Sequence, residues 1–83
     1  MGKYEIVFKR SVAKDLRKIP SKDLSRILKA IDQLAENPRP AGNEKLSSQE
    51  RYRIRQGDYR ILYEVKDNYL IITIVKVGHR RDI

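Results

Sequence analysis

Arginine side chains recur at close spacing in one part of this 83-residue chain. Arg53 and Arg55 are one residue apart, Arg60 follows shortly after them, and Arg80 lies near the C-terminal end. The planar fork of arginine matches phosphate or carboxylate oxygens through two parallel hydrogen bonds. Such a cluster therefore predicts an oxyanion site, and the alternative interpretation is a solvated cationic face.

Arginine side chains cannot move protons because they stay charged at any working pH. They can hold a phosphodiester and stabilise the charge that builds on it. That suffices to accelerate RNA cleavage by the neighbouring 2′-hydroxyl, where the substrate brings its own nucleophile and no metal is needed. A general base and a general acid would help. The local candidates are His79, Glu44, and a tyrosine or a lysine.

A predicted β-hairpin over residues 51–65 would position these arginines. Apolar and basic residues alternate there, which is the period of a half-buried strand. Gly57-Asp58 suits a two-residue type II′ turn, because glycine comes first. Counting outward from the turn gives the pairs Arg55–Arg60, Ile54–Ile61, Arg53–Leu62, Tyr52–Tyr63 and Arg51–Glu64. One face would then be apolar and aromatic, and on the other face only Arg51 has a carboxylate in register.

The remaining elements predict an α+β domain over residues 1–83, with the order β-α-α-β-β-β. Two helices joined at Pro20-Ser21 would pack on one face of a mostly antiparallel four-stranded sheet. The other expected elements are a strand at 3–9, a loop at 39–50 and a last strand at 69–77. A second two-residue turn at Asp67-Asn68 would place Leu62 opposite Thr73 and Arg60 opposite Val75.

The last predicted strand is apolar on both faces, which indicates an interior position in the sheet. The register places Ile71, Thr73, Val75 and Val77 on the face that carries the arginines. An apolar strip beside a cationic one should form a groove with something in it, because single domains rarely leave such a strip bare.

The composition narrows the classes of function. With no cysteine and one histidine, the sequence excludes disulfides and argues against a structural zinc site. The longest apolar run, residues 69–75, is too short to cross a bilayer, so we expect an untargeted cytoplasmic protein. The net charge of +8 favours nucleic acid or an acidic protein as partner. No phosphate-binding loop, dinucleotide fingerprint or nucleophile elbow is present.

Two C-terminal motifs carry a family resemblance. They are Tyr-Arg-Ile-Arg-x-Gly-Asp-Tyr-Arg-Ile-Leu-Tyr-Glu-Val and Val-Gly-His-Arg-Arg-Asp-Ile, and they follow a strand, a helical hairpin and a loop with Lys-Leu. The chain resembles the RelE/ParE superfamily of type II toxin–antitoxin toxins, and is most similar to the RelE branch. The resemblance implies a metal-independent mRNA interferase that needs no cofactor and cuts messenger in the ribosomal A site. It also implies a RelB-like antitoxin, of which we expect an acidic amphipathic segment to bind the groove.

The resemblance assigns roles to single residues. Arg53 and Arg55 match two basic residues, often lysines, that hold the phosphate and help proton transfer. Arg60 matches the transition-state arginine, and Arg80 matches the arginine after the Val-Gly turn. We expect further RNA contacts from Lys45, Arg51 and Arg81, and antitoxin contacts from Leu62, Ile71, Thr73 and Val75.

The chain departs from the RelE pattern at its C-terminal end. RelE-like toxins commonly carry a tyrosine one step beyond Ile83, where this sequence stops. His79 would then take over part of the role of that tyrosine, or activity would be low, or the chain is truncated. Two other classes stay open, a ParE-like toxin that inhibits DNA gyrase and a plain basic RNA-binding module. The four retained arginines favour RNA cleavage. Neutralisation could also act by displacing a C-terminal tail.

Overall fold

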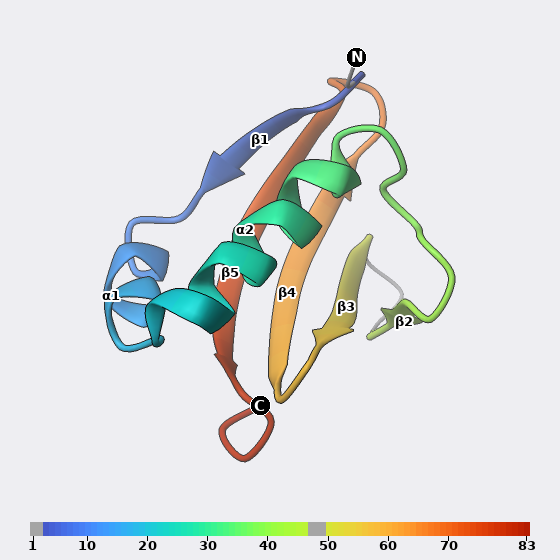
Figure 1. Ribbon diagram of the computed structural model, residues 1–83. Coiled ribbons are helices and arrows are strands. Elements are labelled where there is room, and N and C mark those ends of the chain that lie inside the picture. Colours follow the sequence, from blue (N-terminus) through green and yellow to red (C-terminus); the bar gives the residue numbers. More distant parts are fainter. Residues whose placement is uncertain (1–2, 47–49) are drawn as a thin grey trace.

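The computed structural model describes residues 3–46 and 50–83. Their elements are β1 (Glu5–Phe8), α1 (Val12–Arg17), α2 (Ser21–Leu34), β2 (Glu44–Lys45), β3 (Arg51–Gln56), β4 (Tyr59–Lys66) and β5 (Ile71–His79). One five-stranded sheet has the order β1-β5-β4-β3-β2, and the helices pack on one face of it (Figure 1). No helix within the described ranges has both the length and the apolar character that crossing a membrane requires.

The sheet confirms the predicted α+β class but corrects the number of strands from four to five. The additional strand is β2, which pairs antiparallel with β3 through Glu44–Arg53 and Lys45–Tyr52. The sequence suggested a loop here because two residues are too few to show the alternation that reveals a strand. The sheet is mostly antiparallel as predicted, with β1 running parallel to β5, and β5 lies in its interior.

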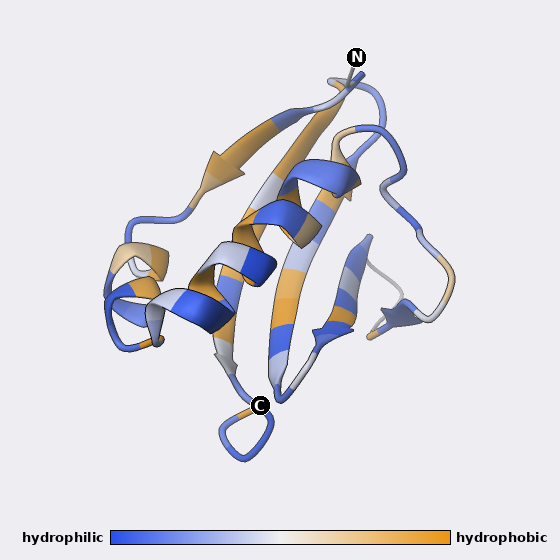
Figure 2. Ribbon diagram, in the orientation of Figure 1, coloured by the Kyte–Doolittle hydropathy of each residue, from blue (hydrophilic) through white to orange (hydrophobic). Residues whose placement is uncertain are grey.

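The helices cover the sheet with apolar side chains at helical spacing. Ile27, Ile31 and Leu34 of α2 are buried, and Val12 of α1 joins them in the core. Figure 2 shows the result, in which the side of α2 that faces the viewer is largely hydrophilic. Leu28 of α2 is apolar but 39% exposed. Pro20 separates the two helices as predicted, and stands as the N-cap of α2.

The first hairpin has the predicted register at every pair that was counted. Gly57 has a φ of +61° and Asp58 has no positive φ, as a type II′ turn requires. On the core face the rings of Tyr52 and Tyr63 stack with centroids 5.8 Å apart. Local turn chemistry therefore fixes the side of the sheet on which each side chain of β3 and β4 lies.

The second hairpin corrects the predicted register. Lys66 pairs with Ile71, so four residues and not two form the turn. A β-bulge follows, because Tyr63 pairs with Ile74 but Leu62 pairs with Lys76. The additional residue reverses the alternation beyond it. Val77 is therefore buried in the core at 2% exposure, although we had placed it on the arginine face.

A polar network at the other end of the sheet ties separate segments together. Arg39 donates hydrogen bonds to the carboxylates of Glu50 and Asp67, both at 2.8 Å, and to the hydroxyl of Tyr52 at 2.8 Å. The Tyr4 hydroxyl donates to Asp67 at 2.7 Å. The network therefore joins the loop after α2 to β3, to the β4–β5 turn and to the residues before β1. It was not predicted, because its members are scattered along the sequence.

The network should make stability depend on pH in the acid range. Hydrogen bonds from Tyr52 and Arg39 lower the pKa of Glu50 from 4.5 to about 2. A lowered pKa stabilises the fold above the unfolded value, and the contribution disappears as pH falls toward the folded value. Glu50→Gln should therefore lower the melting temperature near neutral pH, and the difference from wild type should vanish between about pH 4.5 and about pH 2. Thermal unfolding followed by circular dichroism over this range measures it.

Asp32→Asn is the control, because Asp32 is exposed and forms no ion pair within residues 3–46 and 50–83. Its melting temperature should follow that of the wild type at every pH. A Glu50→Gln difference that persists unchanged to the lowest pH would contradict the role of the ionised carboxylate.

Candidate functional site

The sheet face that the helices leave open carries the predicted arginines. Arg53 pairs with Leu62, and Arg55 pairs with Arg60. Residues opposite each other on neighbouring strands point to the same face. The core residues of β3 and β4 occupy the positions between them. Guanidinium groups from two strands therefore lie on one accessible surface, which we call the arginine face.

Two arginines of this face are paired with carboxylates. Arg51 bonds Glu64, as the register predicted. Arg53 donates to Glu44 of β2, with its Nη2 3.1 Å and its Nε 3.2 Å from one carboxylate oxygen. The expectation that Arg53 has no carboxylate beside it is therefore wrong, because the additional strand brings one. Glu44 is 60% exposed, so the pair is a surface ion pair worth about 0–1 kcal/mol and a phosphate could displace the carboxylate.

Arg55 and Arg60 differ from those two. Within the described ranges no carboxylate forms a salt bridge with either, and Arg60 bonds the backbone carbonyl of Tyr59 at 3.2 Å. Two like charges directly opposite each other on paired strands destabilise a sheet. A bound anion would offset that repulsion, and the planar geometry of the two groups suits the oxygens of a phosphate.

Arg80 lies at the end of the sheet where the first hairpin turns. Its backbone N–H donates to the carbonyl of Asp58 at 2.8 Å, and its guanidinium is 3.9 Å from the Asp58 carboxylate. Gly78 pairs with Arg60, and a side chain at this glycine would meet Ile83 at 3.1 Å. The tail after β5 therefore folds back over the strand at the position beside Arg60.

Three predicted site residues lie apart from the arginine face. The His79 ring contacts the Tyr59 ring edge-on at 5.6 Å, and Tyr59 packs against the core on the helix side. Lys45 pairs with Tyr52 in the sheet and places its Nζ 3.5 Å from Glu50. Arg81 is exposed in the turn after β5, where its backbone N–H donates to His79 Nδ1 at 3.3 Å. The geometry does not bring these side chains to Arg55 and Arg60.

The four residues predicted to bind a partner lie on the open face of the sheet beside the arginines. Leu62, Ile71, Thr73 and Val75 are each half-buried. Val7 of β1 pairs with Thr73 and is 39% exposed, so it extends this strip to the edge of the sheet. An apolar strip therefore runs next to the basic one, as the sequence suggested, although the bulge places Lys76 opposite Leu62 and not Thr73.

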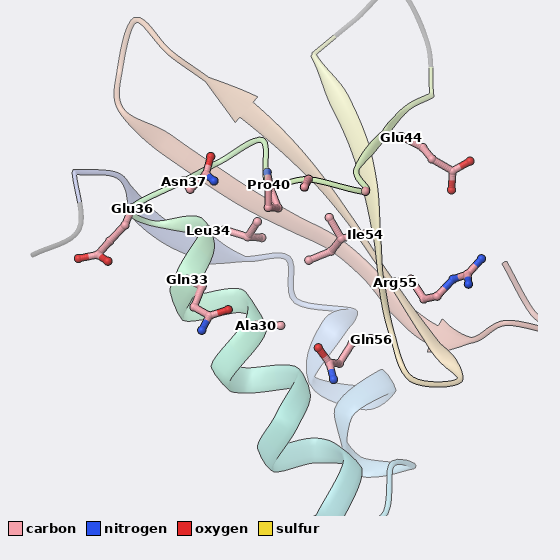
Figure 3. A pocket seen from close by; sticks show the side chains of 12 residues that line it. Ala30, Gln33, Leu34, Glu36, Asn37, Pro40, Glu44, Ile54, Arg55 and Gln56 are labelled. Atoms are coloured by element: carbon pink, nitrogen blue, oxygen red, sulfur yellow. The ribbon is translucent and has the colours of Figure 1, made fainter.

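A cavity of about 790 Å³ lies between α2, the following loop and β3. Figure 3 shows Leu34 and Ile54 pointing toward one another inside it, whereas the guanidinium of Arg55 points away. Gln33 and Gln56 add polar groups to its wall. The cavity and the arginine face are therefore separate features that share the edge of β3.

Comparison with known proteins identifies the fold. Residues 6–83 match the model of a family described as the ParE toxin of type II toxin–antitoxin systems. The chain belongs to the ParE toxin family. A putative toxin RelE1 from Methanocaldococcus jannaschii is 32% identical over 94% of this chain and 91% of that protein. The mRNA interferase toxin RelE of Escherichia coli is 28% identical over 93% of this chain and 83% of that protein.

A solved structure supports the same assignment. The RelE–RelB complex of Pyrococcus horikoshii contains a chain that superposes with a TM-score of 0.82 at 28% identity, covering 94% of this chain and 96% of that one. The predicted membership of the RelE/ParE superfamily of type II toxins is confirmed. The open arginine face is therefore a candidate site for the activity of the toxin.

Replacing Glu44 of the toxin by glutamine should strengthen binding of anions to the arginine face. The change removes the carboxylate that Arg53 now contacts and keeps the size of the side chain. We expect a single-stranded RNA to bind several-fold more tightly, and stability to change by less than about 1 kcal/mol. Fluorescence anisotropy and thermal unfolding measure the two quantities.

Asp32→Asn removes an equal charge from an exposed position on α2, and serves as the control. If both substitutions tighten RNA binding equally, the effect is one of net charge and the ion pair has no special role.

Proposed function

We propose that this toxin is an endoribonuclease that cleaves messenger RNA on the ribosome. The observation that carries the proposal is the facing pair Arg55–Arg60 on an open sheet surface, with Arg53 beside it. A relative aligned over 93% of this chain is described as an mRNA interferase toxin, which supports the same class of reaction. The reaction site on the ribosome would be the A site, and the toxin would act in the cytoplasm.

The arginines would act on a phosphodiester in which the ribose 2′-oxygen attacks phosphorus. The bond from phosphorus to the 5′-oxygen of the next nucleotide breaks, leaving a 2′,3′-cyclic phosphate. Negative charge grows on the two non-bridging oxygens in the transition state, and Arg55 and Arg60 can each donate to one of them. Arg53 would hold the phosphate once it has exchanged Glu44 for it. Arg80 would approach from the end of the sheet, and Arg51 and Arg81 would contact flanking phosphates.

Glu44 contacts Arg53 directly. Its carboxylate would therefore lie beside the bound phosphate once Arg53 has released it. It could accept the proton of the 2′-hydroxyl. His79 would serve as the proton donor only if it left the Tyr59 ring, and Lys45 would contact RNA only if it left Glu50. These proton-transfer roles can be separated by single substitutions at positions 44 and 79.

Mapping messenger ends after incubation with translating ribosomes tests the proposal. Purified toxin should produce new 5′-hydroxyl ends within the reading frame, and toxin with Arg60→Ala should not. Growth arrest with intact messenger and broken DNA would overturn it in favour of a toxin that inhibits DNA gyrase. Binding of RNA without cleavage or arrest would indicate a plain RNA-binding module.

We also propose that a RelB-like antitoxin covers the apolar strip and neutralises the arginine face. An acidic amphipathic segment would place apolar side chains on Leu62, Ile71, Thr73 and Val75, and carboxylates near the arginines. Protein chains described as RelB accompany the similar toxin in the Pyrococcus horikoshii complex. Titrating the toxin with its antitoxin should displace a bound single-stranded RNA. Simultaneous binding of both would contradict a shared surface.

A further inference from the structure

Most of the toxin's net positive charge lies away from the arginine face. Residues 9–34, which run from the end of β1 through the helical hairpin, contain eight basic and three acidic residues, and so carry five of the chain's eight net positive charges. The basic residues of this segment are Lys9, Arg10, Lys14, Arg17, Lys18, Lys22, Arg26 and Lys29, and all of them are exposed.

Three of these side chains form a line on α2. Lys22, Arg26 and Lys29 are spaced by four and three residues, so they share one face of the helix over about 10 Å. The opposite face holds the buried Ile27 and Ile31. The line therefore points away from the sheet, and Figure 2 colours the outer side of the α2 ribbon largely as hydrophilic. We call these three residues the α2 basic stripe.

The stripe has no internal partner. In the described part of the chain, no carboxylate lies within salt-bridge distance of any of its three side chains. This contrasts with Arg39, Arg51 and Arg53, each of which contacts an acid. Helix residues three and four apart are neighbours, and like charges at these spacings destabilise the helix. No salt bridge between described residues relieves these repulsions.

We propose that the α2 basic stripe is a second RNA-binding surface, which docks on the phosphate backbone of folded, double-stranded RNA. Phosphate contacts need exposed cations and no apolar anchor. The stripe fits this, because Ser25 and Gln33 flank it and no apolar side chain interrupts it. A protein partner would need a buried aromatic or aliphatic anchor at the centre of the contact. A membrane surface is disfavoured because the apolar face of α2 is already used by the core.

The two surfaces then have different tasks. The arginine face and the α2 basic stripe lie on opposite sides of the sheet and cannot contact one RNA strand at the same point. The stripe would hold the toxin on a structured RNA while the arginine face engages a single strand. The role given to this second contact rests on the proposed function, but the test measures RNA binding alone.

The test compares two double substitutions that remove equal charge. Lys22→Gln/Lys29→Gln alters the stripe, and Lys3→Gln/Lys66→Gln alters two exposed lysines outside it. Glutamine has a helix propensity close to that of lysine, so the fold should be kept. The probe is a short RNA duplex, and fluorescence anisotropy gives its affinity over a series of salt concentrations. The stripe variant should reduce the slope of log K against log salt by about 1.5, since each lost phosphate contact lowers it by roughly 0.7–0.9. The control should keep the wild-type slope.

Three results would overturn the proposal. Equal losses in both variants would indicate an effect of net charge, and unchanged binding in the stripe variant would exclude a phosphate contact. Unchanged duplex binding together with weaker antitoxin binding would assign the stripe to a protein partner. Failure of the proposed function has a different signature, because duplex binding would follow the expected pattern while messenger on ribosomes stayed intact.

Discussion

Replacing Arg60 by alanine should lower the rate of messenger cleavage on translating ribosomes by about 100- to 1,000-fold, which is the usual cost of removing one donor to a developing oxyanion. Arg60 stands opposite Arg55 at the centre of the arginine face, and its guanidinium bonds one backbone carbonyl and no carboxylate of the described residues. Its removal relieves a repulsion between like charges. Stability should therefore stay constant or rise while activity falls. Single-turnover cleavage and thermal unfolding together measure this divergence.

Arg60→Lys and Lys3→Ala complete the experiment. Lysine keeps the charge but loses the planar fork, so its activity should fall between wild type and alanine. Lys3 is an exposed lysine outside the arginine face, so its removal controls for net charge. If Arg60→Ala lost its folded structure together with its activity, the loss of activity would not be evidence for a catalytic role of Arg60. Full activity in Arg60→Ala would remove the basis for oxyanion stabilisation by this face.

An aspartate at position 77 should destabilise the toxin by about 3–5 kcal/mol, whereas the same substitution at position 75 should cost less than about 1 kcal/mol. The bulge in β5 places Val77 in the core at 2% exposure, and leaves Val75 half-buried on the other face. An unpaired carboxylate in the core loses its hydration without gaining a partner. Since small domains are stable by only about 5–15 kcal/mol, Val77→Asp should be largely unfolded in mild denaturant. Urea unfolding of the two variants measures the difference.

Val75→Asp also reports on the apolar strip. It should fold and bind the antitoxin more weakly, because it places a charge where we propose an apolar contact. Equal destabilisation at positions 75 and 77 would mean that the alternation runs through β5 without the bulge. Unchanged antitoxin affinity in Val75→Asp would place the antitoxin on another surface.

The first hairpin could be predicted to the residue because its signals are local. Gly57 supplies the positive φ that the turn requires, and the alternation of Tyr52 and Ile54 with arginines leaves one choice of face. The arginine face followed from these few residues. The comparison with known toxins then confirmed the family that the same motif had indicated.

The second hairpin could not be predicted in the same way. Residues 70–75 are uniformly apolar or β-branched, so a shift of the register by one residue leaves the hydrophobic pattern unchanged. The turn contains Leu70 with a φ of +54°, which is rare for a residue other than glycine or asparagine. The ion pair between Arg53 and Glu44 could not be predicted from the sequence either, because it depends on a strand of two residues.

The pairing of β1 with β5 has a consequence for when the toxin can become active. The interior strand of the sheet comes from residues 71–79, and its parallel neighbour comes from residues 5–8. A nascent chain that has not yet been extended through β5 can form the helical hairpin and the first β-hairpin but cannot close the sheet. Contacts between segments so distant in sequence also form slowly. A toxin with this topology therefore closes its sheet only after β5 has been synthesised.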